Sequence, residues 1–257
     1  MGRTVSTGVD IYVEEGGEAS GPVLLLLHGL GANGDVWKGM LPFIRKGWKG
    51  RWVIPDFRGH GRSTHRGPYT IAGHAADVAS LFDQDEEVVV VGHSMGGLVA
   101  LALATNWFGL RIERAAAFSV KTDWIPGEIE KFYQLSDAPV RWFENEAEAI
   151  DRYLKVSGLI GHVSADSLEA RSGIVEQQGR YRLAADPRTY RVVGSDVASV
   201  IAAARSPFRL AAGSNDNMVK LSDMIAFDNR AVLFDGLGHN AHVEDPERVW
   251  ASISGNS

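Results

Sequence analysis

A serine in this sequence lies where its hydroxyl could act as a nucleophile. Ser94 stands at the centre of Gly92–Gly96 (GHSMG), a G-x-S-x-G pattern. The four valines of Val88–Val91 precede the pattern, and an apolar stretch with helical character follows it. A sharp turn between a buried strand and a helix exposes such a serine, and glycines are needed where the backbone segments crowd together. We therefore predict that Ser94 is a catalytic nucleophile.

A serine hydroxyl needs a neighbouring base to remove its proton, and two histidines near the end of the sequence are candidates. His239 follows the glycines of Gly236–Gly238, in a loop that leaves its ring exposed and adjustable. His242 lies nearer the predicted C-terminal helix, where packing is the better interpretation. We therefore predict His239 as the general base. These histidines and Glu244 could also bind a metal ion, but nothing else in the sequence completes such a site, so no metal is expected.

The carboxylate that would orient this histidine is predicted to be Asp216. It ends the segment Gly213–Asp216 (GSND), which directly follows a predicted strand. The chain order is then Ser94, Asp216 and His239, the order expected when a G-x-S-x-G turn carries the nucleophile. Asp123, which follows the preceding predicted strand, remains the alternative acid.

Acyl transfer also needs donors for the oxyanion that develops on the substrate. The backbone N–H of Met95 is one candidate, because this residue follows the nucleophile at the start of a predicted helix. The second is the backbone N–H of Leu30, within His28–Gly31 (HGLG) directly after Val23–Leu27 (VLLLL). The glycines on either side of Leu30 allow the backbone to approach a substrate closely.

The elements that must position these residues alternate along the chain. The predicted strands are continuously apolar, which indicates burial on both faces, as in a parallel sheet; they lie at 23–27, 52–54, 88–91, 115–120, 208–212 and 231–234. The main predicted helices lie at 34–46, 71–83, 95–107, 217–226 and 246–254. This alternation predicts the α/β class, with a mostly parallel, doubly wound sheet. Val9–Val13 could add an antiparallel edge strand.

The region from 122 to 205 interrupts this alternation. It is polar with scattered aromatic residues and no convincing buried strand, and its predicted helices lie near 127–135, 145–157, 164–178 and 195–205. We therefore assign residues 1–121 and 206–257 to a core domain and 122–205 to a helical insertion that sits over one end of the sheet. Its aromatic residues either pin the insertion to the core or line an apolar substrate pocket above Ser94, and Trp124 and Trp142 are the pocket candidates.

Five motifs of the chain resemble those of the α/β-hydrolase superfamily, in the form found in small capped serine carboxylesterases. They are HGLG (28–31), DFRGHGRS (56–63), GHSMGG (92–97), GSND (213–216) and GLGHNAHVEDPE (236–247). The resemblance extends over about residues 20–121 and 206–254.

The resemblance implies an α/β-hydrolase fold and hydrolysis of carboxylic esters through an acyl-enzyme on Ser94, without a cofactor. We expect the acyl groups to be small to medium in size. The resemblance also implies that residues 56–63 form a structural turn rather than part of the catalytic machinery. By the same resemblance, the insertion at 122–205 is a helical cap that walls the substrate pocket. Haloalkane dehalogenases and epoxide hydrolases resemble this fold but have an aspartate at the nucleophile position, so their chemistries are disfavoured. A lactonase, a C–C bond hydrolase, an amidase, an acyltransferase or a small-molecule receptor that retains the three residues remain alternatives.

The composition argues against several other kinds of chemistry and partner. The 257 residues include no cysteine, which excludes disulfides and thiolate nucleophiles and fits a reducing, cytoplasmic location. The net charge of −6 comes with interspersed acidic and basic residues, so no basic stripe predicts a nucleic-acid partner. The apolar runs are too short to cross a bilayer, and no secretory signal pattern is present, so no membrane partner is expected.

Overall fold

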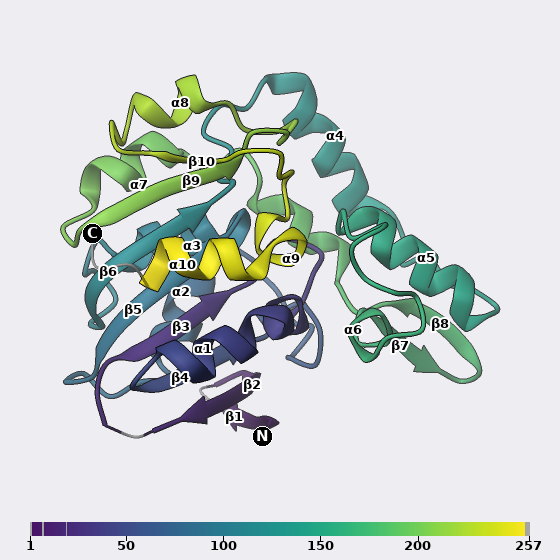
Figure 1. Cartoon of the computed structure of the whole chain (residues 1–257). Helices are drawn as coiled ribbons and strands as arrows, with labels where there is room; N and C mark the ends of the chain where they lie inside the picture. The colour runs from purple at the N-terminus through teal and green to yellow at the C-terminus, as the bar shows by residue number, and fades with distance from the viewer. Residues whose placement is uncertain (1, 7, 19, 255–257) are drawn as a thin grey trace.

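A computed structural model of the chain describes residues 2–6, 8–18 and 20–254. An eight-stranded sheet forms its centre, in the order β1-β2-β4-β3-β5-β6-β9-β10 (Figure 1). The strands are β1 (Gly2–Ser6), β2 (Asp10–Gly17), β3 (Val23–Leu27), β4 (Arg51–Pro55), β5 (Glu87–His93), β6 (Arg111–Phe118), β9 (Phe208–Gly213) and β10 (Val232–Phe234). Neighbours from β4 to β10 run parallel, which confirms the predicted mostly parallel α/β sheet.

The antiparallel end of the sheet is longer than the sequence predicted. The expected edge strand at Val9–Val13 corresponds to β2, which pairs antiparallel with β4 on one side. On its other side β2 pairs antiparallel with β1, so β1 forms the edge.

Helices cover both faces of the sheet. One face carries α2 (Ile71–Ala79), α3 (Met95–Leu103), α7 (Val197–Ala203) and α8 (Leu221–Ile225). The other carries the 3-10 helix η1 (Gly34–Met40), α1 (Leu41–Gly47), α9 (Ala241–Glu244) and α10 (Pro246–Ser254). The sheet is therefore doubly wound, as the alternation of strands and helices predicted.

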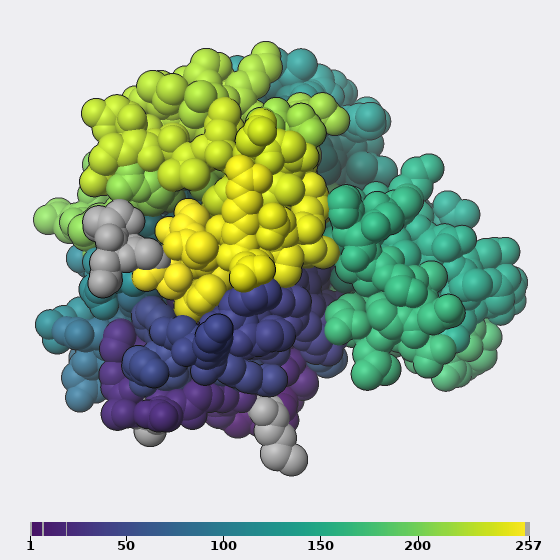
Figure 2. All heavy atoms as spheres, in the orientation of Figure 1, coloured from purple at the N-terminus to yellow at the C-terminus, as the bar shows by residue number. Residues whose placement is uncertain are grey.

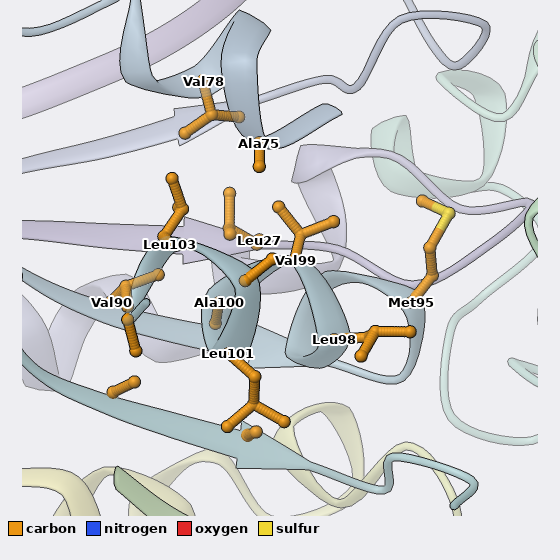
Figure 3. Close-up of a cluster of buried hydrophobic side chains, with 14 of the residues drawn as sticks. Leu27, Ala75, Val78, Val90, Met95, Leu98, Val99, Ala100, Leu101 and Leu103 are labelled. Atoms are coloured by element: carbon orange, nitrogen blue, oxygen red, sulfur yellow. The ribbon is translucent and has the colours of Figure 1, made fainter. Parts of the chain in front are cut away.

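The continuous apolar run of β3 is explained by these two layers. Side chains of a strand alternate between the faces of its sheet. Leu25 and Leu27 pack in the core beside α2 and α3, whereas Leu24 and Leu26 pack beside η1 and α1. Figure 3 shows Leu27 in the first of these cores, beside residues of α2 and α3. All four leucines are fully buried, and each burial stabilises the fold by roughly 1.5–3 kcal/mol.

The insertion stands out from one end of this core as a separate lobe (Figures 1 and 2). Its elements are α4 (Pro126–Asp137), α5 (Glu146–Val156), α6 (Leu168–Arg171), β7 (Ile174–Gln177), β8 (Arg180–Leu183) and the 3-10 helix η2 (Pro187–Val192). The predicted helix at 164–178 is wrong, since only the short α6 is helical there and an antiparallel hairpin follows it.

The hairpin forms because of its two-residue turn. Gln178 and Gly179 join β7 to β8 with φ values of 54° and 75°, the left-handed conformation that a tight type I′ hairpin requires at both positions. Gly173 lies just before β7, and a Cβ there would clash with the ring of Tyr153. The close approach of backbone to ring at this point ties the hairpin to α5.

The last helix of the insertion belongs to the core by its packing. α7 contacts α3, and its Val197 and Ile201 are buried in the same cluster as β3 and α2. The segment from 195 to 205, which the sequence placed in the cap, thus includes a helix that covers one face of the sheet.

Candidate active site

Ser94 occupies a strained turn between β5 and α3. Its φ of 52° and ψ of −115° fall outside the regions that residues with a side chain ordinarily adopt. The turn is held by a hydrogen bond from the Ser94 N–H to the carbonyl oxygen of Phe118, at 2.7 Å. Strain of this kind persists only where the surrounding structure enforces it, and it concentrates at functional sites.

The glycines around Ser94 allow neighbouring backbones to approach. A Cβ on Gly96 would clash with the carbonyl oxygens of Leu27 and His28, at the end of β3. A Cβ on Gly92 would clash with the carbonyl oxygen of Gly96 itself. Both glycines of the G-x-S-x-G pattern are therefore required by contacts, and these contacts place Ser94 beside the loop that follows β3.

His239 and Asp216 are joined by a hydrogen bond. The His239 Nδ1 lies 2.9 Å from the Asp216 Oδ2, and the other carboxylate oxygen of Asp216 accepts the Met218 N–H at 2.8 Å. Burial raises the pKa of this carboxyl, but the hydrogen bonds from His239 and Met218 outweigh it and hold the pKa of Asp216 below its usual value. An ionised Asp216 accepts from Nδ1–H, which leaves Nε2 of His239 free to act as a base.

One cavity of about 570 Å³ brings the predicted residues together. Its wall includes Ser94, Asp216, His239, Met95 and Leu30. Apolar and aromatic side chains from α2, α3, α4, η2 and nearby loops line much of the remainder, among them Ile71, Leu98, Val120, Phe132 and Tyr190. The site thus combines a hydroxyl, a histidine–carboxylate pair and an apolar chamber at the carboxyl ends of the central strands, where parallel α/β sheets bind their ligands.

The two alternative residues lie elsewhere. His242 is buried between Trp37 and His93, with ring centroids 4.3 and 4.5 Å away. Burial, with a smaller effect of His239, lowers the pKa of His242 to about 3, so its ring is neutral. Asp123 is exposed on the loop after β6. Neither residue lies in the wall of the cavity.

Comparison with known proteins fits this architecture. The model of the alpha/beta hydrolase family matches residues 24–252. The chain belongs to this family. A pimeloyl-[acyl-carrier protein] methyl ester esterase from Aromatoleum aromaticum is 30% identical over 250 residues, which cover 88% of this chain and 94% of that protein.

Other relatives of this hydrolase match it over shorter stretches or by fold alone. The magnesium-chelatase 30 kDa subunit of Rhodobacter capsulatus is 42% identical over 102 residues, 38% of this chain. The match spans 35% of that protein, about a third of its length. A thioesterase domain from the curacin biosynthetic pathway superposes with a TM-score of 0.79, covering 99% of both chains, at 21% sequence identity.

None of the helices in the described part of the chain has the length and apolar character needed to cross a membrane.

The loop after β3 is fixed in the hydrolase by a buried histidine. His28 is fully buried, its Nδ1 donates to the carbonyl oxygen of Gly29 at 2.8 Å, and its Nε2 accepts the Phe57 N–H at 2.9 Å. Burial lowers the pKa of His28 to about 3, so this arrangement is that of a neutral ring. The loop carries Leu30 into the cavity wall, which Met95 also lines. The N–H of Met95 belongs to the first turn of α3 and has no acceptor within the helix.

The two cap tryptophans differ in their surroundings. Trp124 lies in the cavity wall, edge-to-face with Phe132 at 5.6 Å between ring centroids. Trp142 does not line this cavity, so its prediction as a pocket residue is corrected. It faces a separate hollow, and the guanidinium of Arg180 lies 5.2 Å from its ring centroid. The next residue, Phe143, is buried and exchanges backbone hydrogen bonds with Tyr181 of β8, which directs Trp142 to the opposite side.

Proposed function

We propose that this alpha/beta hydrolase cleaves carboxylic esters of small to medium acyl groups through an acyl-enzyme on Ser94. The observation that carries the proposal is the hydrogen bond between His239 and Asp216 at a cavity that Ser94 also lines. The esterase from Aromatoleum aromaticum, which aligns along most of the chain, supports ester chemistry. No cofactor takes part in the proposed reaction.

The first half-reaction acylates the serine. The Ser94 Oγ attacks the ester carbonyl carbon while Nε2 of His239 accepts the hydroxyl proton. The negative charge that develops on the carbonyl oxygen is stabilised by the backbone N–H groups of Leu30 and Met95. His239 then gives its proton to the departing alcohol, and the acyl group stays on Ser94.

The second half-reaction releases the acid. Water attacks the acyl carbon, Nε2 of His239 accepts one of its protons, and the same two backbone N–H groups stabilise the oxyanion again. The C–O bond to Ser94 breaks, and the proton on His239 returns to Oγ. Asp216 keeps Nδ1 of His239 protonated throughout and stabilises the imidazolium that forms in each half-reaction.

We expect Asp216→Asn to lower turnover on the order of 10⁴-fold, because an amide would hold the histidine in the wrong tautomer. Steady-state kinetics on a nitrophenyl ester measures the loss. The matched control is Asp123→Asn, which changes an exposed carboxylate outside the cavity and should be mild. If the control proved the more severe change, the acid would be assigned to the loop after β6.

We expect the enzyme to prefer short acyl groups, because the catalytic candidates line a chamber with largely apolar walls, the form of a small-molecule pocket rather than of a lipid-docking surface. The kcat/KM for acetyl to hexanoyl nitrophenyl esters should exceed that for palmitoyl esters, without activation at an oil–water interface. Equal or better activity on emulsified long-chain triglyceride would contradict the proposal and indicate a lipase.

The other reactions open to the same three residues are separated by a parallel panel. Several lactones, an amide, a C–C bond substrate and an alcohol acceptor, assayed beside the esters, distinguish lactonase, amidase, C–C bond hydrolase and acyltransferase activities. A receptor that retains the three residues would turn over a nitrophenyl ester once or slowly, whereas an esterase completes many cycles. A panel in which esters are the poorest substrates would overturn the proposal.

A further inference from the structure

The residue just before the nucleophile bonds to the backbone of the proposed base. His93 ends β5 with its ring almost fully buried, and its Nε2 lies 2.9 Å from the carbonyl oxygen of His239. A carbonyl oxygen can only accept a hydrogen bond, so Nε2 of His93 carries the proton. Through this bond, the strand that presents Ser94 is linked to the loop that presents His239.

The ring of His93 also packs against the other parts of the site. Its centroid lies 4.8 Å from that of His239, with the planes inclined by 66°, so the rings meet edge to face. A Cβ on Gly29 would lie 2.7 Å from Nδ1 of His93, which places the ring directly against the loop that carries Leu30. One side chain therefore contacts the turn of the nucleophile, the base and the loop of the proposed oxyanion donor.

The charge state of His93 keeps this bond in place. Burial, followed by the neighbouring His242 and His239, lowers the pKa of His93 well below its usual value. The ring is therefore neutral at ordinary pH and has a single N–H. Because that N–H is used on the carbonyl of His239, Nδ1 is unprotonated where it faces Gly29.

The loop that carries the base is held at several points, and the bond from His93 is the one that acts at His239. His239 follows Gly236, which has a φ of 79°, and Gly238, so the backbone before it is intrinsically permissive. Asp216 holds Nδ1 of the His239 ring. Other hydrogen bonds hold the backbone just before His239: the carbonyl oxygen of Leu237 accepts the Asn215 N–H at 2.8 Å, and the Gly238 N–H donates to Glu244 at 2.7 Å. The bond from His93 constrains the backbone at His239 itself, so the ring is held from both its side-chain and its main-chain ends.

We propose that His93 is a positioning residue for the reaction of Ser94: its Nε2–H fixes the backbone of His239 and so the position of the His239 ring in the cavity that Ser94 also lines. The inference rests on the proposed function of Ser94 and His239. Displacement of a reacting group by about 1 Å lowers rates roughly 10²-fold. Loss of the bond should accordingly act on kcat and leave substrate binding in the apolar chamber nearly unchanged.

The test compares variants at His93 with a matched control. His93→Leu removes the donor, whereas His93→Gln keeps an N–H at a similar reach. His242→Leu is the control, because His242 is also buried and packs against the ring of His93. Both ring nitrogens of His242, however, lack a hydrogen-bond partner among residues 2–6, 8–18 and 20–254. We expect His93→Leu to lower kcat about 10–100-fold with KM changed less than about twofold, and His93→Gln and His242→Leu to stay within about threefold of the original kcat.

Two further measurements make the outcome decisive. Tm values show how much packing each variant has lost, and the rate at which a fluorophosphonate labels Ser94 reports the nucleophile without reference to a particular ester. The proposal would be overturned if His93→Leu and His93→Gln lost kcat equally. It would also be overturned if His93→Leu and His242→Leu lost kcat equally at similar Tm. In either case His93 would contribute packing alone. Should His93→Leu not fold, His93→Asn takes its place, because its amide is one methylene too short to reach the carbonyl.

The labelling experiment also separates this inference from the proposed function. Unchanged labelling of His93→Leu, in an otherwise reactive protein, overturns only the role of His93. A protein whose Ser94 is neither labelled nor needed for turnover overturns the proposed function, and the role of His93 with it.

Discussion

Ser94→Ala is expected to lower ester turnover by about 10⁴–10⁶-fold while the fold stays intact. Alanine keeps the backbone conformation that the glycines around the turn permit, and it removes only the oxygen that would form the acyl-enzyme. Steady-state assays on a nitrophenyl ester, with protein free of contaminating esterase, measure the loss, and circular dichroism with Tm checks the fold. Retention of more than a few per cent of the activity would contradict the assignment of the nucleophile.

The matched control for this variant is Ser195→Ala. Ser195 lines the same cavity, but its hydroxyl donates to the carbonyl oxygen of Val192 at 2.7 Å. Its loss should leave turnover within a few-fold of the original protein. A comparable loss in both variants would mean that the chamber tolerates no change of its walls, and the specific role of Ser94 would need chemical labelling to establish it.

His239→Ala is expected to lower turnover about as much as Ser94→Ala, because the serine hydroxyl does not react at a useful rate unless a base accepts its proton. The sharper expectation concerns the double variant. Residues that act as one catalytic unit are strongly non-additive, so Ser94→Ala with His239→Ala should lose no more than either single change. A double-mutant cycle on kcat measures this. Additive losses would show that the two residues do not act in the same step.

The control for the histidine is His242→Ala. This ring is buried beside Trp37 and is absent from the cavity wall, so its removal should lower Tm and affect turnover only modestly. Exchanged phenotypes, with His242→Ala inactive and His239→Ala active, would identify His242 as the base.

The sequence was most informative where the physical signal is local. The runs at Val23–Leu27 and Val88–Val91 are apolar throughout because both faces of each strand are covered. Such a run can be recognised in the sequence without knowing which strands pair with it. The glycines beside Ser94 are an equally local signal for the turn, since each is required where another backbone segment passes within contact distance. Strand order, in contrast, depends on pairings between distant segments, and the edge position of β1 followed from no local feature.

The cap was harder because its structure depends on one short turn. The pair Gln178-Gly179 makes the hairpin, but glutamine is an unusual residue for the first left-handed position. A strong turn signal is therefore missing here, and a helix was predicted. The error at Trp142 has the same origin, since the side to which it points is set by the pairing of Phe143 with Tyr181. His93 was overlooked because it occupies a variable position of the G-x-S-x-G pattern, and only the folded chain brings its ring to His239.

The pairing of β6 with β9 has a consequence for synthesis of the protein. Ala115 lies opposite Phe208, so the edge of β6 can be covered only after the whole insertion has been translated. The end of β9 at Gly213 lies 95 residues after the end of β6 at Phe118, an interval of roughly 5–20 s at ordinary rates of elongation. During that time we expect the exposed edge of β6 to favour association of the nascent chain with other chains. A chain released within the insertion would carry Ser94 on its turn but neither Asp216 nor His239.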